Sequence, residues 1–189
     1  MKFCSDCGEQ VTQKIPQGDN RPRYVCNACE TIHYQNPRII AGCIAEHDSK
    51  VLLCKRAIEP RLGLWTLPGG FMENNETTLQ AAARESFEEA NAKMTDLSLY
   101  CTYSIPHISQ VYIMYRGVLV DGYAAPGEES LETELYSQAD IPWDQLAFPV
   151  MRESLKLYFN DRNTGNFQVR NGVIYRDEDQ QLIVENYPA

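Results

Sequence analysis

Alternating runs of apolar and polar residues divide the middle of the chain into short elements. Strand-like runs lie at 39–46, 51–54, 97–105 and 110–120, and a turn at 48–50 joins the first two into a hairpin. Helical patterns cover 77–90 and 149–158, and the second begins at a proline, which suits a first helical turn. Residues 126–134 are interpreted as an acidic loop. This order predicts an α/β fold in which helices pack on a mixed sheet.

The two ends of the chain differ from this middle part. Residues 1–33 contain too few large apolar side chains to form a core without a cross-link. In the tail, Asn171-Gly172 lies between β-forming residues, a pattern that predicts a hairpin turn. The predicted organisation is therefore a small unit at 1–33, a linker at 34–38, a core domain at 39–160 and a β-hairpin extension at 161–189.

Charge and composition narrow the classes of partner. The 189 residues carry a net charge of −9, although residues 1–40 hold five basic and four acidic side chains. The remainder is therefore strongly acidic, which argues against nucleic acid as the main partner. No apolar run approaches the ~18 residues of a membrane span. Because the first residues lack the apolar core of a secretory signal, the expected compartment is the cytoplasm.

Four cysteines near the N-terminus form two Cys-x2-Cys pairs, Cys4 with Cys7 and Cys26 with Cys29. The eighteen residues between the pairs fall in the range of structural zinc sites. Four thiolates complete a tetrahedral shell and leave no open position. We therefore expect a structural Zn²⁺ in a zinc ribbon, in preference to disulfides or an iron–sulfur cluster.

The helix predicted at 77–90 carries the strongest chemical signal in the chain. With about 100° of rotation per residue, three carboxylates fall on one face, those of Glu85, Glu88 and Glu89. A separate apolar stripe, which we expect to be the buried side, consists of Leu79, Ala83, Phe87 and Ala90. Like charges at this spacing repel one another. A hard divalent cation such as Mg²⁺ or Mn²⁺ would reverse that effect, because it prefers oxygen ligands.

These carboxylates belong to a longer pattern that starts at the turn Pro68-Gly69-Gly70. Its spacing is Gly-x5-Glu-x7-Arg-Glu-x2-Glu-Glu, at Gly70, Glu76, Arg84, Glu85, Glu88 and Glu89. A solvated acidic face is the ordinary interpretation of two adjacent glutamates on a helix. The residue type required at each of the six positions occurs at about one position in fifteen. The expected number of chance matches in a chain of this length is therefore on the order of 10⁻⁵. The whole pattern therefore indicates a metal site.

The pattern resembles the Nudix box, and the preceding run 64–70 resembles the usual entry to that box. The resemblance covers about 39–160 and implies an α/β/α sandwich in which water attacks a diphosphate linked to a nucleoside. The implied ligands of Mg²⁺ or Mn²⁺ are Glu85, Glu88, Glu89 and the carbonyl of Gly69. It also implies that Arg84 pairs with a box carboxylate and orients it, and that Glu76 supports the loop.

Further residues receive roles through this resemblance. Asn91 stands where the family often has glycine, and asparagine also adopts the left-handed conformation that ends a helix. A carboxylate outside the helix is often the base, and the candidates are Glu128, Glu129, Glu132 and Glu134. Glu132 matches the family's loop acid best. Tyr34 matches a tyrosine that contacts substrate, and packing between domains is the alternative role. Arg56 would contact a phosphate or adenine, and an exposed cation at the end of a strand is the alternative.

A zinc ribbon joined to a Nudix domain resembles the NADH pyrophosphatases and the FAD/ADP-ribose pyrophosphatases of chloroplast type. Residues 103–110 lack the signature of the NADH group, whereas 33–38 and 52–56 resemble the other group more closely. The expected reaction releases AMP and a second monophosphate from FAD or ADP-ribose, with NADH or NAD⁺ as the alternative substrate. A nucleic-acid-binding or regulatory protein that only senses a ligand is the alternative of another class. The resemblance also implies a homodimer.

Overall fold

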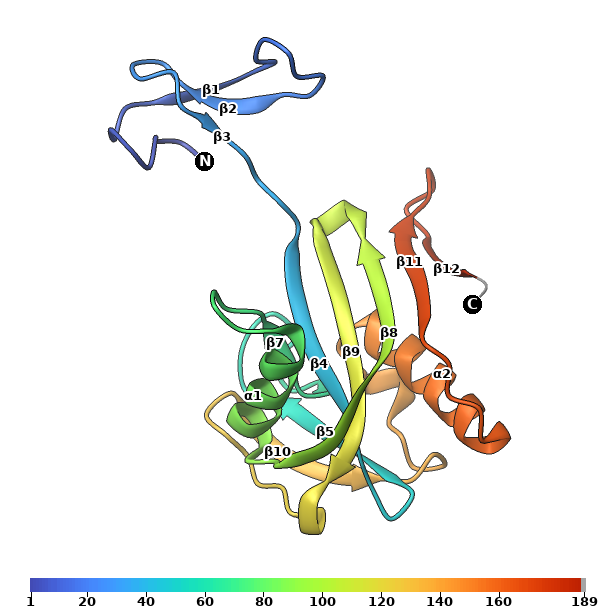
Figure 1. Ribbon diagram of the computed structural model, residues 1–189. Helices are drawn as coiled ribbons and strands as arrows, with labels where there is room; N and C mark the ends of the chain where they lie inside the picture. Colours follow the sequence, from blue (N-terminus) through green and yellow to red (C-terminus); the bar gives the residue numbers. More distant parts are fainter. Residues whose placement is uncertain (188–189) are drawn as a thin grey trace. The chain divides into compact units, whose positions relative to one another are not determined.

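The computed structural model describes residues 1–187, and the chain divides into two compact units, Met1–Pro37 and Arg38–Ala189. The first unit is a three-stranded antiparallel sheet with the order β1-β2-β3 (Figure 1). Its strands are β1 (Val11–Lys14), β2 (Arg23–Cys26) and β3 (Ile32–His33). The buried apolar residues of this unit are Cys4, Val25 and Cys26. So small a core agrees with the expected need for a cross-link.

The second unit is built around a mixed sheet with the order β10-β5-β4-β9-β8-β11-β12. β4 pairs with β9 in parallel, as β8 does with β11, and the other neighbouring strands are antiparallel. Two short strands, β6 and β7, pair with β5 and β4. The strands are β4 (Arg38–His47), β5 (Lys50–Arg56), β6 (Trp65–Thr66), β7 (Gly69–Phe71), β8 (Met94–Ile105), β9 (Gln110–Leu119), β10 (Ser130–Tyr136), β11 (Arg170–Arg176) and β12 (Leu182–Tyr187).

Strand β4 is buried on both faces, and its successive side chains point alternately toward two helical layers. Ile40 and Ile44 pack in the cluster that contains α2 (Pro149–Thr164), whereas Ala41 and Cys43 pack with α1 (Thr78–Ala90). The two helices therefore lie on opposite faces, and the predicted α/β/α sandwich is confirmed (Figure 1). Among the residues described up to 187, the unit also has three short 3₁₀ helices, η1 (Pro106–Ile108), η2 (Val120–Gly122) and η3 (Trp143–Gln145).

Helix α1 buries a different side from the one predicted. Leu79 and Phe87 are exposed, and only Ala90 of the predicted stripe is fully buried. The buried residues of the helix are Ala81, Ala82, Ser86, Glu89 and Ala90. Small residues let the helix approach β4 closely, where Ala41 and Cys43 also leave little room. The close approach turns the carboxylate face partly inward and buries one of its members.

The ends of α1 agree with the sequence. Thr77 caps its start in a reciprocal capping box with Gln80. Asn91 ends it in the left-handed conformation, with φ of 50° and ψ of 22°, as expected for the residue at the family's glycine position. The bounds of the helix are therefore set by local side chains, although its buried face is not.

Two local predictions were wrong. The acidic stretch 126–134 is a loop only as far as Glu129, because β10 begins at Ser130 and pairs with β5. Asn171-Gly172 lies inside β11 and forms no turn, while the β11–β12 turn lies at 177–180. In both places pairing with a distant strand overrides the local preference. The tail hairpin exists, but β11 joins the main sheet beside β8.

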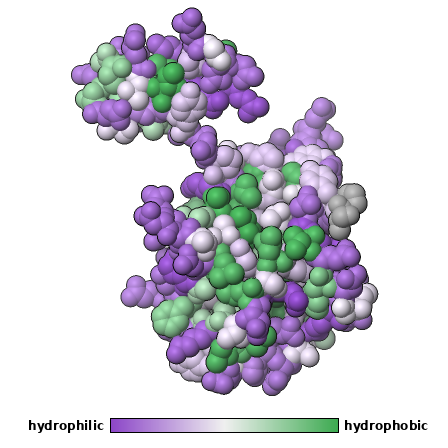
Figure 2. Space-filling view, viewed as in Figure 1, coloured by the Kyte–Doolittle hydropathy of each residue, from purple (hydrophilic) through white to green (hydrophobic). Residues whose placement is uncertain are grey.

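The sheet face that carries α1 is only partly covered by the helix. Figure 2 shows an apolar patch on this side, in the view of Figure 1. Ile39 and Leu99 are exposed and lie on this face. Ile39 is two residues before Ala41, which packs with α1, and Leu99 lies opposite Tyr115 of β9, which belongs to the same cluster. Exposed apolar patches are typical of surfaces that partners cover, so this patch is a candidate surface for the expected homodimer. The homodimer itself stays a prediction. Within the described residues, no helix is long and apolar enough to cross a membrane.

Candidate active site

The short strand β7 brings the glycine-rich turn against α1. It pairs with β4, so that Gly69 lies opposite Gly42 and Gly70 opposite Ala41. The backbone N–H of Gly69 donates to Glu89 Oε2 at 3.2 Å. A Cβ atom at Gly70 would lie only 2.5–2.6 Å from the carboxylate of Glu85. Glycine at this position leaves room for the flexible Glu85 side chain, whereas a Cβ atom at Gly69 would lie 2.7 Å from the backbone Cα of Gly42, so that no side chain fits there.

Arg84 holds three carboxylates of the box together. Its Nη1 donates to Glu85 at 2.7 Å and to Glu88 at 2.8 Å. Its Nε and Nη2 bind Glu76 through both oxygens, at 3.0 and 2.8 Å, and this ion pair lowers the pKa of Glu76 to about 2. Nη2 also reaches the carbonyl of Phe71 at 3.1 Å. Arg84 thus ties the helix, the loop and β7 to one another.

Glu89 is the buried member of the acidic cluster, with a relative exposure of 6%. Burial raises the pKa of its carboxyl group to about 8, even though the Gly69 N–H favours the charged form. Burial also raises the pKa of Glu85, against the effect of Arg84. The charge of Glu129 disfavours ionisation of both groups. Negative charge is therefore crowded and poorly solvated at this site.

This donor set fits a hard divalent cation. The oxygens are carboxylates, which Mg²⁺ and Mn²⁺ prefer. A cation would offset the burial that disfavours the charged forms of Glu85 and Glu89. In the structure Arg84 neutralises part of Glu85 and Glu88, whereas the carboxyl group of Glu89 accepts from the backbone N–H of Gly69. The residues expected as ligands line one cleft, but among the described residues only the four cysteines form a group of three or more whose ligand atoms all lie within 4.8 Å of one another. The role of the glutamates as metal ligands stays a prediction.

The acidic cluster lines a cleft of about 990 Å³. Aromatic and cationic residues line the same cleft, namely Arg38, Arg56, Phe71, Tyr112 and Phe148. The guanidinium group of Arg38 lies over the ring of Phe71 at 4.8 Å from its centre, and that of Arg56 over Phe148 at 5.2 Å. Of these five residues, only Arg56 was expected at the site. The others are far apart in sequence and share no pattern.

Two of the four candidate loop acids line the cleft, Glu128 and Glu129. Glu132, which the sequence favours as the base, lies on β10 instead. Its carboxylate pairs with Lys55 at 3.2 Å, and it is not among the residues that line the cleft. A bulge inside β10, between Ser130 and Glu132, shifts the register against β5, so that Glu132 lies opposite Lys55. The geometry therefore favours Glu129 as the acid beside Glu85 and Glu89, the expected metal ligands.

The two predicted substrate contacts lie in different units. Arg56 ends β5 and lines the cleft, where its charge favours ionisation of Glu89. Its Nε donates to the carbonyl of Pro60 at 2.9 Å, and this hydrogen bond helps to fix the orientation of the guanidinium group. Tyr34 belongs to the first unit, where Arg23 lies over its ring at 5.1 Å from the centre and most of the side chain is exposed. Its role in substrate binding stays a prediction.

The four cysteines of the first unit are arranged as a zinc site. Cys4 and Cys29 have sulfurs 3.7 Å apart, those of Cys7 and Cys26 are 3.4 Å apart, and all four lie within 4.8 Å. A tetrahedron with Zn–S bonds of about 2.3 Å has edges of about 3.8 Å, whereas a disulfide needs about 2.05 Å. His33 Nε2 lies 3.3 Å from the sulfur of Cys4, a neighbour that no sequence spacing indicated.

We expect replacement of Cys26 by serine to remove the zinc and unfold the first unit alone. The metal supplies most of the folding free energy of such a unit, whereas the second unit has its own core. Elemental analysis should find about one zinc per wild-type chain and close to none in Cys26→Ser. Cys101→Ser is the control, since that cysteine is buried in the second unit. Retention of stoichiometric zinc by Cys26→Ser would contradict the assignment.

Comparison with known families identifies both units. The family described as Nudix N-terminal, a zinc ribbon, matches residues 2–35, and the family described as NUDIX domain matches residues 36–158. The second match covers more than half of the chain and contains the cleft and the whole box. The chain therefore belongs to the Nudix family, and it is a Nudix hydrolase that carries an N-terminal zinc ribbon.

Individual relatives agree with this assignment. The ADP-ribose pyrophosphatase of Methanocaldococcus jannaschii is 34% identical over 122 residues, which are 61% of this chain and 69% of that protein. The NAD-capped RNA hydrolase NudC of Haemophilus influenzae is 31% identical over 76% of this chain, which spans about half (52%) of that protein's length. A crystal structure of a Nudix hydrolase from Nitrosomonas europaea matches with a TM-score of 0.89 and 54% identity, covering 93% of this chain and 100% of that one.

Proposed function

We propose that this Nudix hydrolase cleaves the pyrophosphate of ADP-containing compounds and releases AMP and a second monophosphate. ADP-ribose is the first candidate substrate and FAD the second. The proposal rests on one observation, the meeting of a crowded acidic cluster and an aromatic, cationic wall in a single cleft. The acidic side chains suit a metal-bound diphosphate, and the aromatic side chains suit a nucleoside.

The ligands of Mg²⁺ or Mn²⁺ in this proposal are Glu85, Glu88, Glu89 and the carbonyl of Gly69. A divalent ion at this position would neutralise the diphosphate and acidify the attacking water. Arg84 keeps the carboxylates in place through its pairs with Glu85 and Glu88. Its further pair with Glu76 holds the loop that precedes the helix. These contacts hold the three carboxylates in the region of the cleft before substrate binds.

Glu129 acts as the general base in this proposal. It takes a proton from water as the water oxygen bonds to one phosphorus, and the bond from that phosphorus to the bridging oxygen breaks. The departing monophosphate keeps the bridging oxygen and its electron pair. Arg56 lines the same cleft and supplies a cation for phosphate oxygens. Glu132 lies on β10 and pairs with Lys55 of β5, so it would need to leave that ion pair to take the same role.

The alternative substrates are NADH, NAD⁺ and the NAD cap of RNA. The similarity to the NudC relatives favours them, although the chain spans about half of the Haemophilus influenzae protein's length (52%). All of these compounds contain the same ADP diphosphate, so the residues that bind the diphosphate and the adenosine do not distinguish them. The residues of the cleft that contact the group joined to ADP decide the choice.

We expect AMP to be released from ADP-ribose when Mg²⁺ or Mn²⁺ is present, with loss of at least about a hundredfold in rate without either ion. Chromatography of the products from ADP-ribose, FAD, NADH and NAD⁺, with kcat/KM for each, measures both the metal requirement and the preference. Glu129→Gln should be much slower than Glu132→Gln. Cleavage of nucleoside triphosphates alone, with none of the four compounds turned over, would overturn the proposal.

A further inference from the structure

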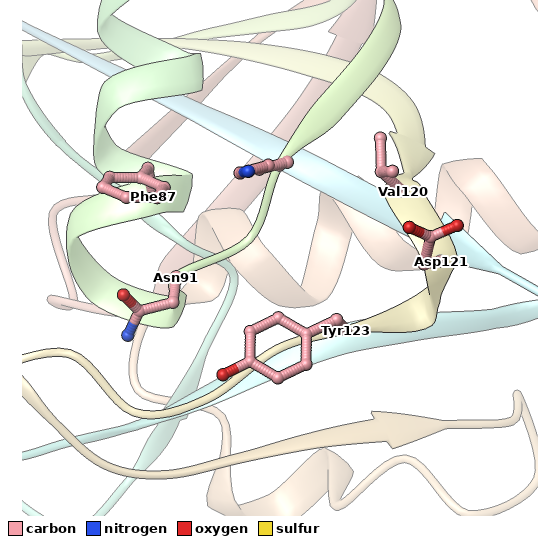
Figure 3. Close-up of a pocket in the computed structure, with 6 residues that line it drawn as sticks. Phe87, Asn91, Val120, Asp121 and Tyr123 are labelled. Atoms are coloured by element: carbon pink, nitrogen blue, oxygen red, sulfur yellow. The ribbon is translucent and has the colours of Figure 1, made fainter.

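We infer that Asn91 is a positioning residue, whose side-chain amide holds the loop that presents Glu129 against the end of helix α1. The inference rests on the proposed function, since it assigns Glu129 a part in hydrolysis. Asn91 follows the last residue of α1 and also borders a small pocket with Phe87 and Tyr123 (Figure 3). The loop 124–129 runs from there to the cleft.

The amide of Asn91 makes two contacts with this loop. Its Nδ2 donates to the carbonyl of Ala125 at 3.0 Å and to that of Pro126 at 3.3 Å. The backbone N–H of the same residue donates to the carbonyl of Phe87 at 2.7 Å, as a helix cap. One residue therefore performs two separate tasks. Its backbone ends the helix, and its side chain holds the loop.

The loop backbone completes the connection. The N–H of Ala125 donates to the carbonyl of Ala90 at 2.8 Å, and that of Gly127 to the carbonyl of Glu89 at 2.9 Å. These bonds satisfy carbonyls that the end of a helix leaves unpaired. A Cβ atom at Gly127 would lie 1.7 Å from the carbonyl oxygen of Glu88. The loop therefore lies directly on the last turn of α1, the turn that carries two proposed metal ligands.

Glu129 follows this contact by two residues. A turn from Gly127 to Ser130, closed by an N–H···O bond of 3.2 Å, connects the loop to β10. The carbonyl of Glu129 accepts from the N–H of Ala57 at 2.8 Å, which anchors the far side of the loop to the segment after β5. The Asn91 contact on one side and the Ala57 contact on the other thus set the distance between Glu129 and the carboxylates of α1.

A glycine would serve the helix cap as well as asparagine does, because it adopts the left-handed conformation without strain. The resemblance to the Nudix box places a glycine at this position in many relatives. A glycine has no amide with which to reach Ala125 or Pro126. Asparagine thus keeps the cap and adds the loop contact, which makes Asn91→Gly a substitution that removes only the second task.

The first experiment measures the clamp without any substrate. In Asn91→Gly, the amides of Ala125 and Gly127 should exchange hydrogen at least about tenfold faster than in the wild type, since the loop opens more often. The unfolding temperature of the second unit should change by no more than about 3 °C. Gln180→Gly is the matched control, because Gln180 also has positive φ (62°) but lies in the β11–β12 turn. Unchanged exchange of both amides in Asn91→Gly would overturn the inference.

The second experiment connects the clamp to catalysis. With the best diphosphate substrate of the wild type, Asn91→Gly should lower kcat about tenfold and leave KM within about twofold, because a displaced base affects the chemical step. In a Glu129→Gln background the same substitution should have no further effect on kcat. Equal losses in both backgrounds, or full activity of Asn91→Gly, would overturn the positioning role. Failure of the wild type to cleave any diphosphate would instead contradict the proposed function, and hydrogen exchange would still test the clamp.

Discussion

Glu89→Gln is expected to make the metal-free protein more stable and to lower its activity by on the order of 10³-fold, because a lost metal ligand removes several kcal/mol of transition-state stabilisation. The stability gain follows from burial. The pKa of Glu89 is about 8 in the folded protein, against 4.5 for an unperturbed glutamate. A raised carboxyl pKa means that the folded state holds its proton more tightly, so this group favours folding less and less as the pH rises from about 4.5 to about 8.

Glutamine has no proton to lose, and at pH 7 the variant should be more stable by about 3 kcal/mol. The difference should nearly vanish at pH 4.5 and level off above pH 8. The groups that act on Glu89 are Glu85 and Glu129, which raise its pKa, and Arg56 and the Gly69 N–H, which lower it. Urea unfolding at several pH values, in magnesium-free buffer with the zinc ribbon loaded, measures the gain. Adding Mg²⁺ should stabilise the wild type and remove most of the difference.

Glu88→Gln is the matched control for this experiment. Its carboxylate is exposed and pairs with Arg84, so a glutamine there should change stability by no more than about 0.5 kcal/mol. Activity should still fall, because Glu88 is also a proposed ligand. A Glu89→Gln protein that is no more stable than the wild type at pH 8, or one that retains its turnover, contradicts the assignment of a buried metal ligand.

Arg170→Met is expected to destabilise the second unit by about 3–5 kcal/mol, because it leaves a buried carboxylate without its cation. Asp161, on α2, is 1% exposed. It accepts two hydrogen bonds from Arg170 at 2.5 and 3.0 Å and one from the hydroxyl of Tyr100 at 2.9 Å. These contacts join the end of α2 to the start of β11, beyond the residues that the NUDIX family matches.

Urea unfolding should show this loss as a lower midpoint. The double variant Asp161→Asn/Arg170→Met should recover part of the stability, since no buried charge remains unpaired. Arg176→Met is the control on the same strand, where an exposed arginine donates to the carbonyl of Gln180. It should cost less than about 0.5 kcal/mol. A loss below about 1 kcal/mol in Arg170→Met would show that Asp161 does not depend on this partner.

The sequence predicted those features that depend on short stretches of chain. The spacing from Gly70 to Glu89 placed the carboxylates on one helix, and the Cys-x2-Cys pairs predicted the zinc ribbon. Thr77 and Asn91 marked the ends of α1, which the structure confirms. These predictions succeed because a few residues on one helix or turn have nearly fixed relative positions, whatever the rest of the chain does.

Only the tertiary structure decided which side of α1 is buried, which acid faces the cleft and where the tail turns. Glu89 is buried because the helix packs closely on β4, and no helical wheel contains that partner. Glu129 lines the cleft and Glu132 does not, because Glu132 lies on β10 opposite Lys55, whereas Glu129 precedes the strand. Asn171-Gly172 is extended because β8 and β12 pair with it. Each outcome depends on strand register and packing between distant segments, and those contacts override local preference when the core forms.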